Sequence, residues 1–465
     1  MLHHLKHYLG YNEFRPGQQE VVEALLQGKD VLALLPTGMG KSLCYQLTGK
    51  MMQRTVLIIS PLLSLMQDQV EQMKKMGIKR VIALNSFLTR MEKQQALQQL
   101  SQYEFIFTSP EMLQQGDVKE RLTQLNIGLI TIDEAHCISQ WGYDFRPDYL
   151  RLGKWLKSQK NIPILALSAT ATYEVMDDIK KVLHMTSPFV YLHNMDRKEL
   201  HFSRKWFNTT DEKVRWIKEH VMQTMGPGII YTPSRRKTEE IARLLQDVHI
   251  QAAAYHAGLE SHDRQLIQAQ FIANELEWIV ATSAFGMGVH KPNIRQVIHE
   301  TMSPSLAHYM QEAGRAARDG QDAVATLLCA PGDDEIIRFL ALDDLPTKNM
   351  VTDFYAGRQL ELSETQLRVL TYWYSEWSYD EAIQKLKELI TQKMTAIRAT
   401  QDVLYTDECM RVLLMSHFGQ SKQVEELCCS LCSDAVDNLI KVRKWMPLPQ
   451  QMKLNWQERL DKLLN

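Results

Sequence analysis

Short apolar runs alternate with longer amphipathic segments along residues 1–204. The runs are continuous rather than alternating, which is typical of parallel strands that are buried on both faces. Each run is followed by a segment with helical spacing, such as residues 62–76. This rhythm predicts a doubly wound α/β domain. The expected strands fall within residues 30–36, 55–60, 81–84, 105–110, 127–133 and 162–170.

A second series of apolar runs follows a polar stretch near Lys205 and predicts a second α/β domain over residues 205–331. The two domains repeat in pattern only, because the sequence itself contains no repeat between them. The expected strands of the second domain fall within residues 228–234, 252–258, 277–285, 296–302 and 323–330.

Helical spacing dominates residues 332–440, which we expect to form a helical subdomain. Residues 364–394 predict two amphipathic helices joined by a turn at 375–378, and residues 407–419 predict a further helix that Gly419 ends. Aromatic side chains recur in the first two helices at a spacing that favours a core role. These are Trp373, Trp377 and Tyr379.

Composition narrows the class of protein. Of the 465 residues, 45% are hydrophobic and 23% are charged, as in a globular protein of roughly two to four domains. No apolar run approaches the roughly 18 residues that span a bilayer, and the N-terminus lacks the apolar core of a secretion signal. We therefore expect a cytoplasmic protein with no membrane partner. The net charge of −2 argues against nucleic-acid binding over a broad positively charged surface, but it is compatible with a narrow strip of basic residues.

The sequence LLPTGMGKS predicts a phosphate-binding loop where the first strand gives way to a helix. There, backbone N–H groups and a helix N-terminus converge on an anion, Lys41 can reach the β- and γ-phosphates, and Ser42 can bind Mg²⁺. Leu35 stands where the full pattern has glycine, so a GKS that arises by chance in a turn is the alternative. The candidate nucleotide-binding residues are Pro36, Thr37, Gly38, Met39, Gly40, Lys41 and Ser42.

Two carboxylates follow the strand predicted at residues 127–133. Asp133 is placed to hold Mg²⁺ through water, and Glu134 is placed to orient or deprotonate the attacking water. Such a pair is often a solvated strand end, but Lys41 in the same predicted sheet favours the metal site. His136 is either a loop histidine whose hydrogen bonds are only structural, or a link from the carboxylates to a neighbouring motif.

The second domain offers the positive charge that phosphoryl transfer requires. Residues 308–320 place Arg315 and Arg318 three positions apart on one helical face, with Gln311 nearby. Arginines that reach a γ-phosphate across a cleft contribute about 10³–10⁵ in rate. The alternative is a pair of surface arginines. The residues together predict an Mg²⁺-dependent nucleotide hydrolase of two domains.

Nine motifs occur in a characteristic order between residues 8 and 330. They are GYNEFRPGQ, PTGMGKS, ISPLLSLMQDQ, TSPEML, DEAHCISQWGYDFRP, LSATAT, AYHAGL, VATSAFGMGVHKPNIRQVIH and YMQEAGRAARDG. Together they closely resemble the motifs of RecQ-type DNA helicases. The resemblance implies two RecA-like domains that use ATP to unwind DNA in the 3′→5′ direction, in recombination and repair. It implies single-stranded and tailed duplex DNA as partners at the nucleoid, and single-stranded-DNA-binding protein as a further partner.

The resemblance also implies roles for individual residues. Tyr11 would stack on adenine, Gln18 would bond the edge of the base, and Arg15 would contact the nucleotide. Interdomain coupling and phosphate contacts are implied for Ser168, Ala169, Thr170, Thr282, Gly286, Gly288 and Arg295. Contacts to the DNA backbone are implied for Ser234 and Arg235, whereas His256 is either a DNA contact or a structural loop histidine.

An aromatic-rich segment, residues 141–146, follows the carboxylates directly. In the family it is a loop in which Trp141 and Phe145 would stack or wedge against bases, each stack being worth about 1–3 kcal/mol. Arg146 would pair with phosphate or with Glu134. Tyr143 departs from the usual histidine of the family and cannot carry a positive charge, which puts a proton-linked role in doubt.

We hypothesise that DNA binding orders this aromatic segment, shifts Glu134 and His136, and so makes hydrolysis depend on DNA. The alternative is an aromatic cluster that packs under the loop.

Four of the seven cysteines are grouped near the C-terminus. This stretch resembles the zinc module of the family, which implies tetrahedral ligation by Cys409, Cys428, Cys429 and Cys432. The spacing departs from the family, because Ala435 occupies the next expected position and adjacent cysteines rarely bind one ion. The alternative is a degenerate site that helix packing alone holds together.

Longer members of the family continue after the zinc module into a winged helix and a small helical domain, so we interpret the chain as a short form. The mildly basic tail, residues 441–465, either docks on the protein or touches DNA. A DNA-stimulated translocase with weak unwinding, a catalytically idle DNA-binding scaffold and an RNA helicase are the alternative functions. Lys41, Asp133, Glu134, Arg315 and Arg318 are all present, which argues against the idle scaffold.

Overall fold

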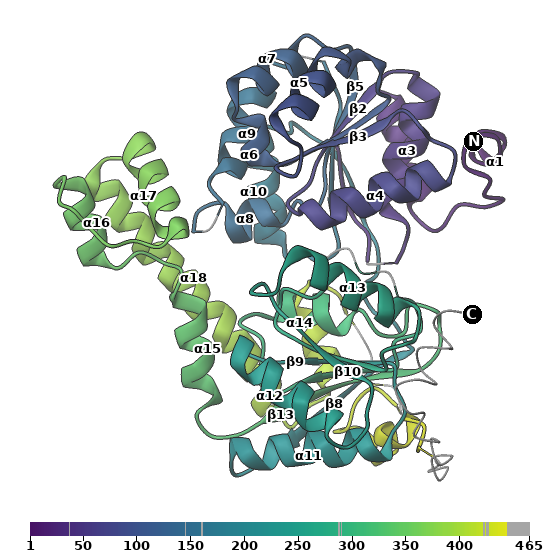
Figure 1. The fold of residues 1–465 in the computed structure, drawn as a ribbon, viewed down its shortest axis with the longest axis vertical. Helices are drawn as coiled ribbons and strands as arrows, with labels where there is room; N and C mark the ends of the chain where they lie inside the picture. The colour runs from purple at the N-terminus through teal and green to yellow at the C-terminus, as the bar shows by residue number, and fades with distance from the viewer. Residues whose placement is uncertain are drawn as a thin grey trace, which may run out of the picture.

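The computed structural model describes residues 1–36, 38–144, 146–159, 161–286, 289, 291–421, 424 and 427–443, but not the side chains of Ser64, Gln140 and Trp141. Figure 1 shows two α/β lobes, one above the other, with a helical arm beside them. Each lobe is built on a parallel sheet, so the expected fold class is confirmed.

The first lobe contains, within the described residues, a parallel sheet in the order β3-β4-β2-β5-β6-β1-β7. Its strands are β1 Val31–Leu34, β2 Thr55–Ile59, β3 Val81–Leu84, β4 Phe105–Thr108, β5 Ile127–Ile132, β6 Ile164–Ser168 and β7 Phe189–Leu192. Six of them match the apolar runs. The seventh, β7, is an edge strand whose side chains are half-buried or exposed, so its short run carries little periodic signal.

Helices cover both faces of the first sheet. They are α1 Leu2–Leu9, α2 Gln18–Leu26, α3 Lys41–Met52, α4 Leu63–Lys75, α5 Arg90–Gln98, α6 Pro110–Leu113, α7 Gly116–Thr123, α8 Cys137–Trp141, α9 Asp148–Leu156 and α10 Tyr173–Leu183, with a short 3₁₀ turn at Leu100–Gln102. Strand side chains alternate between the two faces. Leu32 and Leu34 pack in one core cluster, whereas Val31 and Ala33 pack in the other.

The second lobe contains a parallel sheet in the order β10-β11-β9-β12-β13-β8, again within the described part of the chain. Its strands are β8 Leu200–Trp206, β9 Gly228–Tyr231, β10 Ala252–Tyr255, β11 Trp278–Ala281, β12 Gln296–His299 and β13 Ala323–Cys329; its helices are α11 Thr210–Gln223, α12 Arg235–Gln246, α13 Ser261–Ile272 and α14 Leu306–Ala313. β8 crosses the boundary expected at residue 204 and pairs with β13. The second sheet therefore begins before residue 205.

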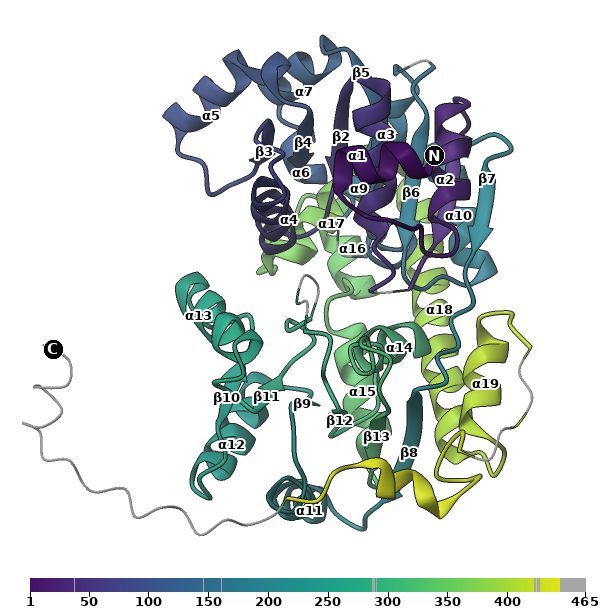
Figure 2. The same ribbon diagram turned by 90° about the vertical axis from the view of Figure 1, so that its right-hand side faces the viewer.

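The arm consists of α15 Asp333–Leu342, α16 Lys348–Tyr355, α17 Glu364–Glu376 and α18 Tyr379–Tyr405. A capping box between Ser378 and Glu381 begins α18, whose 27 residues give it a length of about 40 Å. In both views α18 extends from the first lobe to the second (Figures 1 and 2). Trp373 is fully buried in the core of the arm, as its helical spacing predicts, whereas the ring of Tyr379 is partly exposed.

The chain continues into what we call the cysteine module, residues 409–421 with α19 Met410–His417 and residues 427–443 with a 3₁₀ helix at Asp434–Leu439. It packs beside β8 of the second lobe (Figure 2). Gly419 follows α19 with φ 71°, and the amide of Gln420 bonds Met415 O, so Gly419 ends the helix as expected. Among the helices described, none is both long and apolar enough to cross a membrane.

Candidate active site between the two lobes

The phosphate loop joins β1 to α3 and is shaped by two glycines. Gly38 has φ 91° and Gly40 has φ 72°, a left-handed conformation that costs other residues energy. Gly40 is also the N-cap of α3, so the helix N-terminus points at the loop. These features create an anion site of the kind expected from the sequence. Thr37 lies outside the described residues.

The expected adenine motif is bonded directly to this loop. The Gln18 amide donates to Met39 O at 2.8 Å and to Gly40 O at 3.1 Å, and Arg15 donates to Gly38 O. Tyr11 is 49% exposed, which leaves a face of its ring open for stacking. The residues expected to read the base are therefore bonded to the loop expected to bind the phosphates.

Lys41 and the two carboxylates meet at the end of β5. Lys41 Nζ lies 2.9 Å from Glu134 Oε1. Glu134 has φ 48°, an unusual conformation for a residue other than glycine, and strain of this kind clusters at functional sites. Ser42 Oγ donates to Gln69 Oε1 at 2.9 Å.

The charges at this site shift the acid–base behaviour of its residues. Burial raises the pKa of Asp133 to about 6, against the opposing charge of Lys41. Burial would also raise the pKa of Glu134, but the charge and hydrogen bond of Lys41, with the charge of Arg315, outweigh it and lower that pKa below its usual value. Glu134 is therefore held as a carboxylate, the form that can orient or accept a proton from water.

His136 links the carboxylates to the segment expected to couple the domains. Its Nδ1 lies 3.0 Å from Ser168 Oγ and 3.4 Å from Glu134 Oε2. Ser168 Oγ in turn donates to Thr170 O at 2.9 Å. Burial lowers the pKa of His136 to about 4, so the ring is neutral near pH 7. This geometry matches the second of the two readings of His136, a link between motifs.

Of the two candidate arginines of the second lobe, Arg318 packs against the phosphate loop, and Arg315 lies close enough to the first lobe to act on Glu134. Carbon Cδ of Arg318 lies 3.7 Å from the position that a Cβ on Gly38 would take. Arg318 donates to Val289 O at 3.0 Å, and Arg315 donates to Gly286 O. The charge of Arg315 contributes to the lowered pKa of Glu134 in the opposite lobe.

Gln311 also lies between the lobes, whereas the contacts given for Arg295 and Thr282 lie within the second lobe. Gln311 lines a cavity with Pro36, Ala169 and Thr170 of the first lobe. Arg295 forms an ion pair with Asp319 at 2.5 Å, next to Arg318. Thr282 directly follows β11, and its amide donates to Tyr255 O, whereas Gly288 lies outside the described residues.

The candidate DNA contacts of the second lobe differ in exposure. Ser234 and Arg235 are exposed, and Ser234 also caps α12 by accepting a bond from the amide of Lys237. His256 is buried and its Nε2 lies 3.1 Å from Glu239 Oε1. This pairing favours a structural loop histidine over a direct DNA contact.

The aromatic segment contacts the arm. The Tyr143 ring stacks on Trp377, with centroids 6.4 Å apart, and Lys385 Nζ lies 3.8 Å from the centroid of Tyr143. Trp373 Nε1 donates to Tyr143 O at 3.1 Å. Asp144 forms an ion pair with Lys393 of α18 at 2.6 Å.

The remaining residues of that segment give less information on DNA contacts. Phe145 and the side chain of Trp141 lie outside the described residues. Arg146, expected to pair with phosphate or Glu134, forms an ion pair with Glu111 at 3.2 Å and donates to Pro61 O.

Three of the four grouped cysteines come together. The sulfur atoms of Cys409, Cys429 and Cys432 lie within 4.8 Å of one another, the one such group of possible metal ligands among the residues described. Cys428 is buried but is not part of the group. The structure therefore brings together three of the four expected cysteines, and Cys428 is buried in the same core cluster as Cys409 and Cys429. Ligation of one zinc ion by all four stays a prediction.

Comparison with known proteins places these features in a family. The description "DEAD/DEAH box helicase" matches residues 15–179, and "Helicase conserved C-terminal domain" matches residues 212–320. The chain is 40% identical over 453 residues to "Probable ATP-dependent DNA helicase RecS" of Bacillus subtilis, covering 92% of this chain and 91% of that protein. The chain belongs to the RecQ-type ATP-dependent DNA helicases.

Two further similarities have a narrower scope. The helicase is 35% identical to "ATP-dependent DNA helicase RecQ" of Haemophilus influenzae, over 95% of this chain but 65% of that protein. Its fold resembles that of the helicase MrfA bound to DNA and AMPPNP, with a TM-score of 0.62 at 18% identity, over 83% of this chain and 59% of that chain. The second likeness concerns the fold alone.

Sequence reasoning missed several residues that shape the helicase site. Lys385 and Lys393 hold the aromatic segment, and Gln69 bonds Ser42. Gln69 ends the motif ISPLLSLMQDQ, which offered a signal. The two lysines offered none, because they lie among many other charged residues along α18.

Proposed function

We propose that this helicase hydrolyses Mg-ATP between its lobes and uses the resulting cleft motion to move 3′→5′ on single-stranded DNA and to separate duplexes, in recombination and repair. One observation carries the proposal: Arg318 of the second lobe packs against Gly38 of the phosphate loop. An arginine in that position can stabilise charge on a γ-phosphate that the first lobe holds.

The residues of the first lobe fit a triphosphate with Mg²⁺. The Ser42 hydroxyl and the Asp133 carboxylate supply the oxygen ligands that Mg²⁺ prefers. The raised pKa of Asp133 is what a buried carboxylate shows before a cation compensates its charge. A bound ion would supply positive charge that neutralises the charge developing on the phosphates.

Lys41 would change its partner when a nucleotide binds. Its ammonium pairs with Glu134. A triphosphate on the loop would compete for Lys41, and Glu134 would then be released to orient the attacking water. Arg315, Arg318 and Gln311 would approach the same phosphate from the second lobe.

The aromatic segment supports DNA-dependent hydrolysis, with Trp141 and Phe145 as the base-stacking residues of the proposal. The segment follows Glu134 and His136 directly along the chain, so a change in its position is transmitted to both. Ser234 and Arg235, exposed at the start of α12, are the proposed contacts to the DNA backbone. A complex with single-stranded-DNA-binding protein is a further expectation of the family resemblance.

The cysteine group supports a bound Zn²⁺. Cys409, Cys429 and Cys432 supply three soft ligands, and a fourth would come from Cys428 after a local change or from water. Metal analysis of protein purified without added metal tests this. About one zinc per chain is expected, and a metal-free, fully folded protein would contradict it.

The function itself is tested by comparing the wild type with Glu134→Gln on duplexes that carry a 3′ or a 5′ single-stranded tail. The wild type should unwind the 3′-tailed duplex with ATP, and the variant should bind DNA but lose ATP turnover and unwinding. ATP turnover on single strands without strand separation would instead identify a translocase.

A further inference from the structure

The linker between the lobes, residues 193–199, is the segment through which the chain passes from β7 of the first sheet to β8 of the second. Any change in the angle between the lobes must be accommodated in or next to this linker. Its contacts therefore determine how the two halves of the ATP site are placed relative to each other.

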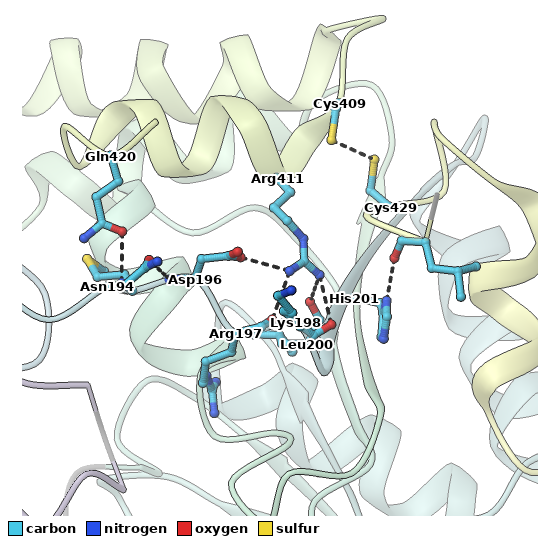
Figure 3. A network of polar contacts seen from close by, with 12 residues as sticks. Asn194, Asp196, Arg197, Lys198, Leu200, His201, Cys409, Arg411, Gln420 and Cys429 are labelled. Atoms are coloured by element: carbon cyan, nitrogen blue, oxygen red, sulfur yellow. Dashed lines mark hydrogen bonds and ion pairs between the residues drawn. The ribbon is translucent and has the colours of Figure 1, made fainter. Parts of the chain in front are cut away.

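The cysteine module binds this linker along most of its length (Figure 3). Arg411 of α19 is 1% exposed and forms an ion pair with Asp196 at 2.9 Å. Its guanidinium also donates to Arg197 O at 3.0 Å and to Leu200 O. A guanidinium suits this task because its donors lie in a fixed plane and reach several acceptors at once.

Gln420, just after α19, binds the other end of the linker. Its Oε1 accepts a bond from the amide of Met195 at 2.9 Å, and its Nε2 donates to His193 O at 3.2 Å. The linker is thus fastened to α19 from its first residue to the start of β8.

The linker in turn holds the segment that carries the arginines. Arg197 donates to Ala316 O at 2.9 Å, and Ala316 directly follows Arg315. Arg197 also lines the interlobe cavity with Pro36 and Gln311. A displacement of the linker would therefore be passed to the arginine segment.

The module is anchored to the second lobe by its cysteine-bearing segment. The amide of Ser430 bonds Phe202 O at 2.9 Å, and the amide of Arg204 bonds Ser430 Oγ at 3.1 Å, both along β8. Cys409 is the N-cap of α19, and its sulfur lies 3.9 Å from that of Cys429 (Figure 3). The cysteine group thus fixes the start of α19, two residues before Arg411, against β8.

We propose that Arg411 is a positioning residue for ATP hydrolysis: it makes the linker a rigid part of the second lobe and so sets where Arg315 and Arg318 meet the phosphate loop. Lobe motion is then confined to the junction before His193. The inference rests on the proposed function of the interlobe site.

The test separates catalysis from nucleotide binding. The dissociation constant of ADP and the kcat of ATP hydrolysis at saturating single-stranded DNA are measured for Arg411→Gln. ADP binds mainly through the first lobe, so its affinity should change less than about twofold, whereas misplaced arginines should lower kcat at least about tenfold. Arg411→Lys, which keeps the charge opposite Asp196, should recover part of the loss.

Arg204→Gln is the matched control. Arg204 also donates to backbone carbonyls beside the module, those of Leu404 and Thr406, but it does not bind the linker. This variant should keep kcat. An equal loss of kcat in Arg204→Gln, or an unchanged kcat in Arg411→Gln, overturns the inference.

Two further variants keep the test decisive. If Arg411→Gln does not fold, Gln420→Ala removes linker bonds from a half-buried position and should lower kcat about threefold with ADP affinity unchanged; an unchanged kcat overturns the inference. Glu134→Gln is assayed beside them. If Glu134→Gln loses ATP turnover and Arg411→Gln keeps it, only the inference about Arg411 is overturned. If both variants keep ATP turnover, the proposed function is overturned as well.

Discussion

Arg318 and Gly38 lie on opposite lobes, yet the Arg318 side chain packs 3.7 Å from the position a Cβ would take on Gly38. The glycine is required by its positive φ, and the absence of a side chain there also lets the arginine approach the loop. The proposed nucleotide site therefore takes residues from both lobes, and the proposal requires the lobes to be close together when ATP is hydrolysed.

The two loop glycines differ in what a side chain would meet, which gives a matched pair of variants. Gly38→Ala and Gly40→Ala should each cost about 1–2 kcal/mol in left-handed strain. A Cβ on Gly40 would lie 2.8 Å from Gln18 Nε2 and displace that amide, whereas a Cβ on Gly38 meets Arg318 at an ordinary contact distance. Both variants should bind ATP more weakly, but Gly40→Ala alone should lose its preference for ATP over GTP. Equal loss of preference in both would contradict the role of Gln18.

The lowered pKa of His136 predicts a pH-dependent loss of stability. The folded protein holds this pKa at about 4, below the ordinary 6.5 of a histidine in the unfolded chain. The unfolded chain therefore takes up the proton first, and stability falls as the pH drops from 6.5 towards 4.

Urea unfolding at pH 7 and pH 5 measures this effect. Between pH 7 and pH 5, the free energy of unfolding of the wild type should fall by roughly 2 kcal/mol more than that of His136→Asn. His262→Asn, which replaces a ring that is 86% exposed, should lose as much stability as the wild type. Parallel losses in all three proteins would show that His136 is not the responsible group.

The ion pair between Asp144 and Lys393 predicts that the arm restrains the aromatic segment. Lys393→Ala should free the segment to reach its DNA-bound position without DNA, and so raise basal ATP turnover. Loss of one partly buried ion pair should shift the equilibrium between the arm-bound and DNA-bound positions of the segment by about 1 kcal/mol, or about fivefold. The stimulation ratio, ATP turnover with DNA divided by turnover without it, should fall by about the same factor. Lys387→Ala, at an exposed position of the same helix, is the control. A stimulation ratio equal to that of the wild type would exclude a restraining role for this contact.

Continuous apolar runs identified most strands, because a strand buried on both faces must be apolar throughout. β1 and β5 are examples, and the functional loops follow them directly. β7 escaped this reasoning because it is a short edge strand, and the start of β8 was masked by polar residues such as His201 and Arg204 within it.

Local sequence could place the candidate active-site motifs but not their long-range partners. Tyr143 and Trp377 are far apart in the chain, and nothing in either segment encodes that their rings stack. The same holds for Arg411 and Asp196. The cysteine count had the opposite limit: it suggested four ligands, whereas three sulfur atoms form the close group in the described residues.

Single-turnover ATP hydrolysis by Arg318→Ala, measured together with nucleotide affinity, tests the central claim most directly. Arg243→Ala, at an exposed position of α12, is the control. If both lobes share one triphosphate, Arg318→Ala should hydrolyse ATP about 10³-fold more slowly while nucleotide affinity changes only a few-fold. Hydrolysis at the wild-type rate would contradict a site shared between the lobes.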